Sequence, residues 1–223
     1  MTDGDLDRIY GHRFGDEDSR VKDALWKEIA RFLQRWVPRD GRVLDVACDR
    51  GYFIRNIEAG ERWATDVREV AADLGPNVHF VQSDGLTLST AVPQGFFDAV
   101  FVSNYLEHLR SPDDVIAQLA QIRTVLKSDG RLIVLQPNIR LVGPAYWDFI
   151  DHRTALTERS LVEAAQAAGF AVEKVIPRFL PYTTKSRLPQ SAWLVRTYLR
   201  FPLAWRLLGK QTLLVARPAG ARA

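Results

Sequence analysis

Cysteine is nearly absent from this chain of 223 residues, which carries Cys48 alone. A single thiol cannot form an internal disulfide, and it excludes a metal site built from several cysteines, so no metal site is predicted. Apolar runs stay well short of the roughly 18 residues that a membrane-spanning helix needs, and no basic-then-apolar leader opens the sequence. Together with 47% hydrophobic and 26% charged residues, these absences lead us to expect a soluble, cytoplasmic, globular protein.

Acidic residues are absent from the last part of the chain. No Asp or Glu follows Glu173, whereas ten Lys or Arg lie between Lys174 and Ala223. Residues 1–173 therefore hold twenty basic against twenty-seven acidic residues, a net charge of −7 that the overall +3 conceals. Such a basic segment indicates an anionic partner, whether a phosphate-bearing substrate, a lipid surface or nucleic acid. A solvated basic face is the simpler alternative.

Apolar strands and helical segments alternate regularly through the rest of the sequence. A helix with an apolar stripe is expected first, starting at Asp18 or Ser19 and ending before Pro38. Strands are then predicted at 42–46, 63–66, 78–82, 97–103, 131–135, 171–176 and 211–216. Helices are predicted at 51–58, 67–74, 112–127 and 158–168, with Ser111 as the N-cap of the third and Gly130 closing it. This order predicts an α/β fold: a doubly wound, seven-stranded, mostly parallel Rossmann-like sheet with helices on both faces and a reversed last strand.

Polar residues follow the predicted strands at the edge where such sheets bind ligands, outside the carboxyl ends of the strands. The segment from Asp45 to Gly51 follows the first strand and leads into a helix, where small residues allow the backbone to approach a ligand. Asp66 ends the second strand, where a carboxylate could accept both hydroxyls of a ribose. Asp84 follows the third strand, although a strand-end Asp is often only a helix cap. The combination predicts a nucleotide-like ligand.

Two longer stretches resemble a known signature. Residues 97–109 read FDAVFVSNYLEHL and residues 125–132 read VLKSDGRL, which is similar to the "FDxVxxxxxLEHL … VLKPGGxL" pattern of class I S-adenosylmethionine-dependent methyltransferases. The match runs from about Val43 to Asn138. The resemblance implies S-adenosyl-L-methionine as cofactor. It places Asp45, Ala47, Asp49 and Gly51 at the methionine end, Asp66 and Val67 at the ribose, Ser83, Asp84 and Gly85 at the adenine, and Ser103 and Asn104 beside the sulfonium.

The first loop departs from the family pattern, because Ala47 and Asp49 replace two of its three usual glycines. Alanine costs little if its φ stays negative, and aspartate tolerates left-handed backbone better than most residues. The Asp49 carboxylate would weaken binding of the methionine carboxylate unless it pairs with the cofactor's amino group or with Arg50. The resemblance gives Glu107 and His108 a structural role, tying their loop to neighbouring backbone.

Groups that could move a proton are concentrated between Pro137 and His152. His152 can take a proton near neutral pH, and Asp148 or Asp151 could orient it, so these three are the predicted catalytic residues. The alternative is that His152 caps the next helix or binds a loop carbonyl. The stretch resembles, more loosely, bacterial methyltransferases of sugars and cell-surface glycan intermediates.

Two flanking pieces are expected to cover the site. Residues 1–40 form an N-terminal arm and helix that could act as a lid, residues 41–180 and 210–218 form the cofactor-binding core, and residues 181–209 form an inserted basic amphipathic cap. The cap carries two Trp and three Arg between residues 188 and 209. It could rest on an anionic membrane or cover the acceptor; plain packing is the alternative.

The leading functional hypothesis is methylation of an oxygen on a small or lipid-linked, sugar-like acceptor, which the basic C-terminal part would allow to be anionic. A second hypothesis is RNA methylation, prompted by the basic C-terminal part. It is disfavoured because residues 103–106 read SNYL where base-methylating enzymes usually carry an Asn/Asp-Pro-Pro-aromatic run. A third is a non-catalytic S-adenosylmethionine-binding partner protein, which the Asp49 substitution would suggest. The LEHL and VLKSDGRL stretches argue against a nicotinamide dehydrogenase.

Overall fold

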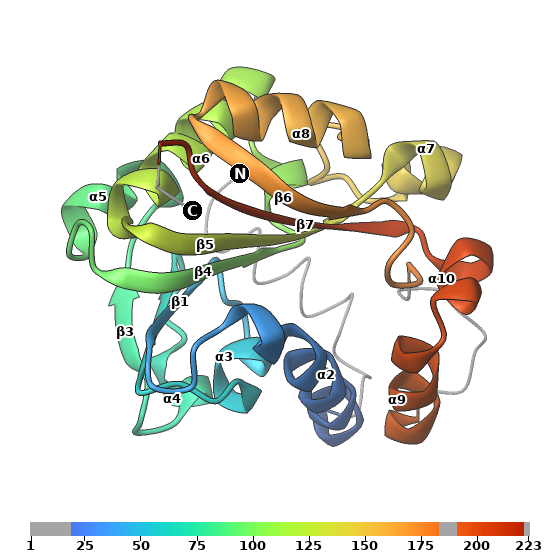
Figure 1. Ribbon diagram of the computed structural model, residues 1–223, viewed down its shortest axis with the longest axis horizontal. Helices are drawn as coiled ribbons and strands as arrows, with labels where there is room; N and C mark the ends of the chain where they lie inside the picture. Colours follow the sequence, from blue (N-terminus) through green and yellow to red (C-terminus); the bar gives the residue numbers. More distant parts are fainter. Residues whose placement is uncertain (1–18, 183–190, 221–223) are drawn as a thin grey trace.

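A seven-stranded sheet forms the centre of the computed structural model, which describes residues 19–182 and 191–220. The strand order is β3-β2-β1-β4-β5-β7-β6 (Figure 1). The strands are β1 (Arg42–Val46), β2 (Glu61–Asp66), β3 (His79–Gln82), β4 (Phe97–Ser103), β5 (Leu126–Pro137), β6 (Phe170–Ile176) and β7 (Gln211–Pro218). Strand β7 pairs antiparallel with both β5 and β6, and the other neighbouring pairs are parallel. The predicted mostly parallel sheet with a reversed last strand is confirmed.

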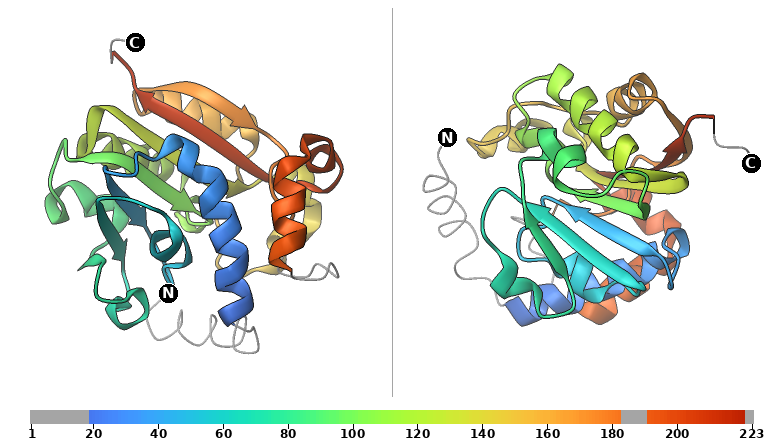
Figure 2. Two further views of the ribbon diagram at one scale, coloured as in Figure 1. Left: turned by 60° about the horizontal axis from the view of Figure 1, so that its bottom comes forward. Right: turned by 90° about the vertical axis from the view of Figure 1, so that its left-hand side faces the viewer.

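Helices cover both faces of this sheet. On one face lie α2 (Ser19–Leu33), α3 (Tyr52–Asn56) and α9 (Ala192–Arg200), with α2 and α9 side by side (Figure 2). On the other lie α5 (Leu88–Ala91), α6 (Pro112–Val125) and α8 (Glu158–Ala167). Shorter elements connect them: η1 (Gln34–Trp36), α4 (Ala71–Leu74), η2 (Gly85–Thr87), η3 (Leu106–His108), α7 (Ile139–Val142), η4 (Gly143–Asp148) and α10 (Pro202–Leu208).

The central strands are mostly apolar because both of their faces are buried. In β4, Val100 and Val102 belong to the hydrophobic cluster under α6, while Ala99 and Phe101 belong to the cluster under α2. Successive side chains of a strand point to opposite faces, so a strand covered on both sides needs apolar residues at every position. This explains the continuous apolar runs from which the strands were predicted.

The junction between α6 and β5 differs from the prediction. The Ser111 hydroxyl accepts the Asp114 N–H at 3.1 Å, which confirms the N-cap. The helix, however, ends at Val125, and the strand already begins at Leu126, which pairs with Phe97. Gly130 therefore lies inside β5 and does not close the helix. A Cβ at Gly130 would lie 2.9 Å from the Phe97 carbonyl oxygen, so the close approach of the two strands requires glycine there.

Two helices near the predicted ligand edge are shorter than predicted. The helix expected over 51–58 spans Tyr52–Asn56, and the one expected over 67–74 spans Ala71–Leu74. In the second case the Asp66 carboxylate accepts the Arg68 N–H, which holds the chain in a turn before α4 begins. Residues 1–18 of the lid expected over residues 1–40, and residues 183–190 of the cap, lie outside the described residues.

Candidate active site

The loop after β1 makes a tight turn through left-handed backbone. Ala47, Asp49 and Gly51 have φ values of +55°, +49° and +66°. Asp49 therefore adopts the left-handed backbone that aspartate was expected to tolerate. The assumption of a negative φ at Ala47 is wrong. A Cβ at Gly51 would lie 2.1 Å from Leu74 Cδ2, so this position requires glycine for space as well as for conformation. The turn leaves the loop backbone at the carboxyl edge of the sheet.

Asp66 joins the loops that follow the first three strands. Its Oδ2 accepts the Asp49 N–H at 2.9 Å, its Oδ1 accepts the Arg68 N–H at 3.0 Å, and its carbonyl oxygen accepts the Ser83 N–H at 2.9 Å. Asp66 is buried. The structure thus brings predicted cofactor residues from three separate loops together. A carboxylate has about four acceptor positions, so Asp66 keeps capacity for a ribose hydroxyl beside the bonds that it already makes.

Arg68 belongs to this site although it was not predicted. Its Nη2 lies 2.7 Å from Asp49 Oδ1, and its Nε lies 3.3 Å from Asp66 Oδ1. Burial lowers the pKa of the guanidinium, but the hydrogen bond to Asp49 and the charge of Asp66 outweigh it and raise the pKa above its usual value. The partner of Asp49 is therefore Arg68 and not Arg50. The position of Arg68, two residues after the acid that ends β2, is the sequence feature from which its role could have been predicted.

Asp45, one residue before the end of β1, is a buried acid. Burial raises its pKa well above the usual range; the Ile54 N–H that it accepts acts in the opposite direction, and the nearby Asp66 and Asp49 charges raise the pKa further. Burial likewise raises the pKa of the neighbouring Cys48 thiol, so this cysteine is protonated and unreactive. The end of β1 therefore contains an acid whose burial costs folding free energy, which is common at ligand sites.

The predicted adenine side has one exposed and one enclosed part. Asp84 is exposed and its Oδ1 accepts the Leu86 N–H at 3.0 Å, so it caps η2. Gly85 is buried, and a Cβ there would lie 2.1 Å from Gln118 Oε1 and 2.5 Å from the Tyr105 hydroxyl. Gln118 is fully buried, and its Nε2 has no hydrogen-bond partner among the described residues. This unused donor beside a glycine fits a polar heterocycle and was missed from the sequence.

Ser103 and Asn104 lie at the centre of the same edge. Asn104 has a φ of +49°, donates its N–H to the Leu135 carbonyl at 2.9 Å and donates Nδ2 to Ser103 Oγ at 2.9 Å. Ser103 is the last residue of β4 and Asn104 follows it; β4 pairs with β1 on one side, and the strand order reverses between these two strands. A crevice at such a reversal point is where doubly wound sheets bind ligands.

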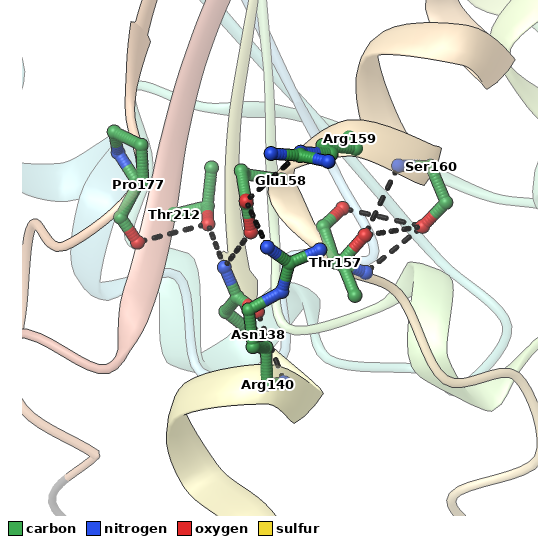
Figure 3. A network of polar contacts seen from close by, with 8 residues as sticks. All are labelled: Asn138, Arg140, Thr157, Glu158, Arg159, Ser160, Pro177 and Thr212. Atoms are coloured by element: carbon green, nitrogen blue, oxygen red, sulfur yellow. Dashed lines mark hydrogen bonds and ion pairs between the residues drawn. The ribbon is translucent and has the colours of Figure 1, made fainter.

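The segment that follows β5 is anchored at both ends (Figure 3). Asn138 donates Nδ2 to Glu158 Oε2 at 2.7 Å and to Thr212 Oγ1 at 3.1 Å, which links the end of β5 to α8 and β7. Burial would raise the pKa of Glu158, but the bond from Asn138 and the charge of Arg140 keep it below its usual value. The Ile139 N–H donates to the Leu156 carbonyl at 3.0 Å, so residues 139–156 form a closed excursion.

This excursion carries the three predicted catalytic residues to different places. Asp148 is exposed on η4. Asp151 is buried against His108, whose Nδ1 lies 3.1 Å from its carbonyl oxygen and 3.4 Å from its Oδ2. The His152 ring lies 5.2 Å from the His108 ring, between centroids. His152 therefore neighbours the "LEH" residues of the loop after β4, a proximity that the sequence did not reveal.

Glu107 lies beside His108 and His152 and connects their two loops. Its carbonyl oxygen accepts the N–H groups of Arg153 and Thr154, so it ties the two loops together as the resemblance implied. Its Oε2 accepts Gln136 Nε2 at 3.0 Å. Burial raises the pKa of the Glu107 carboxyl, and the nearby His108 partly offsets that effect.

The cap helix α9 contacts α2 through a buried acid, Glu28. Arg196 of α9 makes two 2.9 Å hydrogen bonds to Glu28 of α2, and Arg31 binds the same carboxylate at 2.8 Å. The hydrogen bond from Arg196 lowers the pKa of Glu28 most. Arg196 is thus committed to a structural contact, whereas Arg200 and Arg206 are exposed. None of the described helices is long and apolar enough to cross a membrane.

Comparison with known proteins agrees with this geometry. A family model described as "Methyltransferase domain" matches residues 18–175. The Bacillus subtilis (strain 168) protein YqeM, a methyltransferase by name, is 24% identical over 127 residues, and the match covers 52% of this chain but only about half, 50%, of YqeM.

Among solved structures, a SAM-dependent methyltransferase from Archaeoglobus fulgidus has a TM-score of 0.59 at 20% identity, covering 86% of this chain and 94% of the other. A chain from the complex of the Haloferax volcanii methyltransferase activator Trm112 with a methyltransferase has a TM-score of 0.67 at 16% identity, covering 98% and 99%. At these identities the two structures establish the fold.

The glycine-poor turn after β1, the acid at the end of β2 and the buried donor beside Gly85 are compatible with the adenosyl and methionine parts of one ligand at the sheet's reversal point. The family model covers most of the chain and includes all these residues. The chain belongs to the class I S-adenosylmethionine-dependent methyltransferases, with S-adenosyl-L-methionine as its cofactor.

Proposed function

We propose that this methyltransferase acts on an oxygen of a sugar-like acceptor carried by an anionic lipid. The observation that carries the proposal is an apolar and basic surface on the cap helices. Trp193, Leu203 and Leu207 are 68%, 72% and 81% exposed, and Arg200 and Arg206 are exposed on the same two helices. We call these five residues the cap surface. Large apolar side chains exposed together typically mark an interaction site.

The cap surface lies at the same end of the sheet as the cofactor residues. Gln211, the first residue of β7, pairs with Pro137, the last residue of β5, so α10 ends beside the carboxyl edge (Figure 1). A lipid resting on α10 would therefore place its headgroup near the crevice between β1 and β4. The basic side chains suit a phosphate between lipid and sugar.

The acceptor oxygen is proposed to lie beside His152. When bound, S-adenosylmethionine would supply a methyl group on a positively charged sulfur, and the acceptor hydroxyl would give up its proton to His152. The chain's main contribution is alignment of the two reactants, since a correctly oriented pair reacts far faster than a free one. Of the three predicted catalytic residues, His152 is favoured as the base, because Asp148 is exposed and Asp151 contacts His108. The looser likeness of residues 137–152 to sugar methyltransferases supports the acceptor class.

Vesicle binding tests the lipid part of the proposal. Flotation with phosphatidylcholine vesicles, with and without phosphatidylglycerol, should show binding that requires the anionic lipid. Each arginine near such a surface contributes about 1 kcal/mol, so the double substitution Arg200→Gln and Arg206→Gln should weaken binding about 30-fold. Arg159→Gln, an exposed position on α8, is the matched control and should bind like the wild type. Equal binding by the double variant, or none by the wild type, would refute the lipid assignment.

A methyl-transfer screen tests the acceptor class. The wild type should methylate lipid-linked glycans in preference to free nucleotide sugars. RNA methylation is the alternative suggested by the basic C-terminal part, and it predicts RNA binding that falls steeply with salt. Retention of S-adenosylmethionine binding without transfer to any acceptor would favour a non-catalytic role instead.

A further inference from the structure

Three side chains with metal-binding atoms converge where the loop after β4 meets the segment after β5. Glu107, His108 and His152 each present a ligand atom, and these atoms all lie within 4.8 Å of one another. The first two residues are adjacent in η3, whereas His152 comes from the excursion after β5. The fold brings these three residues together, and their spacing in the sequence does not predict the cluster.

We propose that Glu107, His108 and His152 bind a divalent first-row transition-metal ion, with coordination positions left open beside the cofactor edge. Two imidazoles and one carboxylate form a ligand set that suits Zn²⁺, Fe²⁺ and Mn²⁺. Three protein ligands leave at least one position for water or substrate, unlike the closed four-ligand sites of structural zinc.

Neighbouring hydrogen bonds prepare these side chains for such a role. His108 Nδ1 lies 3.1 Å from the Asp151 carbonyl oxygen, so it carries the proton and leaves Nε2 with a free lone pair. Gln136 Nε2 donates to Glu107 Oε2 at 3.0 Å and fixes the carboxylate. Metal-binding histidines usually donate their other ring nitrogen to a carbonyl or carboxylate, which sets tautomer and orientation.

The charge and spacing of the cluster agree with a cation. Glu107 and Asp151 are each 1% exposed, so two carboxylates are buried beside the two imidazoles. A dication would offset that concentration of negative charge. Metal–nitrogen bonds of 2.0–2.1 Å place the ligand atoms of a tetrahedral site about 3.3 Å apart. With ligand atoms within 4.8 Å of one another, binding would require them to approach by up to about 1.5 Å, within reach of side-chain rotation.

The open positions give the ion a function that rests on the proposed methylation of an oxygen. His152 follows β5 in the chain and Glu107 follows β4, so the ion would lie at the carboxyl edge near Ser103 and Asn104. A bound metal ion lowers the pKa of an oxygen ligand and orients it. His152 would then act on the acceptor indirectly, by holding the ion.

Calorimetric titration of untagged, EDTA-treated protein with ZnCl₂ or MnCl₂ alone tests the site. We expect one equivalent to bind to the wild type, and at least about 100-fold weaker binding to His152→Ala, since even the loss of an outer partner typically costs 10–100-fold. His79→Ala is the matched control, because His79 is an exposed histidine of β3 remote in sequence from the cluster, and it should bind like the wild type. Glu107→Gln should weaken binding in the same way as His152→Ala.

Glu107 is buried, so its variant could fail to fold, and the visible spectrum of the Co²⁺-loaded wild type provides an independent measurement. Ligand-field bands that persist in His79→Ala and disappear in His152→Ala would support the site. Equal metal binding by the wild type and His152→Ala would overturn it. These measurements contain neither cofactor nor acceptor. Metal binding without methyl transfer to an oxygen would refute the proposed acceptor alone, and efficient transfer by metal-free protein would refute the role given to the ion.

Discussion

Ala47 adopts a conformation that suits glycine better. Its φ of +55° lies in the left-handed region, which costs an L-residue with a Cβ roughly 1–2 kcal/mol. Replacing Ala47 with glycine would remove this cost, but the larger conformational freedom of glycine in the unfolded state would offset part of the benefit. Ala47→Gly should therefore raise the free energy of unfolding by about 0.5–1 kcal/mol, measured by denaturant titration. Ala117→Gly, on the exposed side of α6, should lower it by about 1 kcal/mol. A loss of stability in both variants would show that Ala47 is not strained.

The buried Asp66 side chain accepts hydrogen bonds from two neighbouring loop residues. It holds Asp49 and Arg68 in place and is proposed to accept a ribose hydroxyl. Asp66→Ala should weaken S-adenosylmethionine binding at least tenfold, about 1.4 kcal/mol, because a charged acceptor and the order of the loop are lost together. Calorimetry measures this directly, with Asp129→Ala at an exposed position of β5 as the control. Unchanged affinity in Asp66→Ala would remove Asp66 from the ribose site.

The pairing of α2 with α9 depends on pH through Glu28. The hydrogen bond from Arg196 lowers the pKa of this carboxyl in the folded state from its usual 4.5. A depressed folded-state pKa contributes stability that is present above the unfolded-state pKa and is lost as pH falls through the folded-state value. The unfolding temperature of the wild type should therefore decline below about pH 4.5 more steeply than that of Glu28→Gln.

At neutral pH the same contact predicts a stability difference without a change in catalysis. Glu28→Gln should lower the unfolding temperature by about 2–4 °C, the shift expected for about 1 kcal/mol in a chain of this size. Differential scanning calorimetry across pH measures both effects. Arg131 and Glu173 form a more exposed ion pair between β5 and β6, so Glu173→Gln serves as the control and should change little. Parallel pH profiles for the wild type and Glu28→Gln would show that the contact does not stabilise the cap.

Acidic and basic residues are distributed unevenly along the chain. The acids precede residue 174, and the described cap helices expose Arg200 and Arg206 at the carboxyl edge of the sheet. Exposed charges are screened over about 8 Å at physiological salt. Binding to anionic vesicles should therefore weaken as salt is added, while the apolar side chains Leu203 and Leu207 keep a salt-independent part.

The sequence by itself determined the order and type of the main elements. Continuous apolar runs predict strands buried on both faces, and strand–helix alternation leaves few topologies. The signature in residues 97–109 and 125–132 indicated the family and, with it, the cofactor. These features are local in the chain, which is why they can be recognised without coordinates. The end of α6 was misplaced because β-pairing of Leu126 with Phe97, a long-range contact, overrides the local signal at Gly130.

Contacts between distant residues were decided by the tertiary structure alone. Arg68 pairs with Asp49, Arg196 with Glu28, and His152 lies beside His108, and each pair is separated in sequence by a distance that no periodicity marks. The positive φ of Ala47 likewise follows from closure of the turn against Thr65, not from the preference of alanine. Side-chain partners depend on how loops pack after the sheet has formed. The sequence therefore predicts the edge at which the chemistry occurs, and the fold selects which side chains meet there.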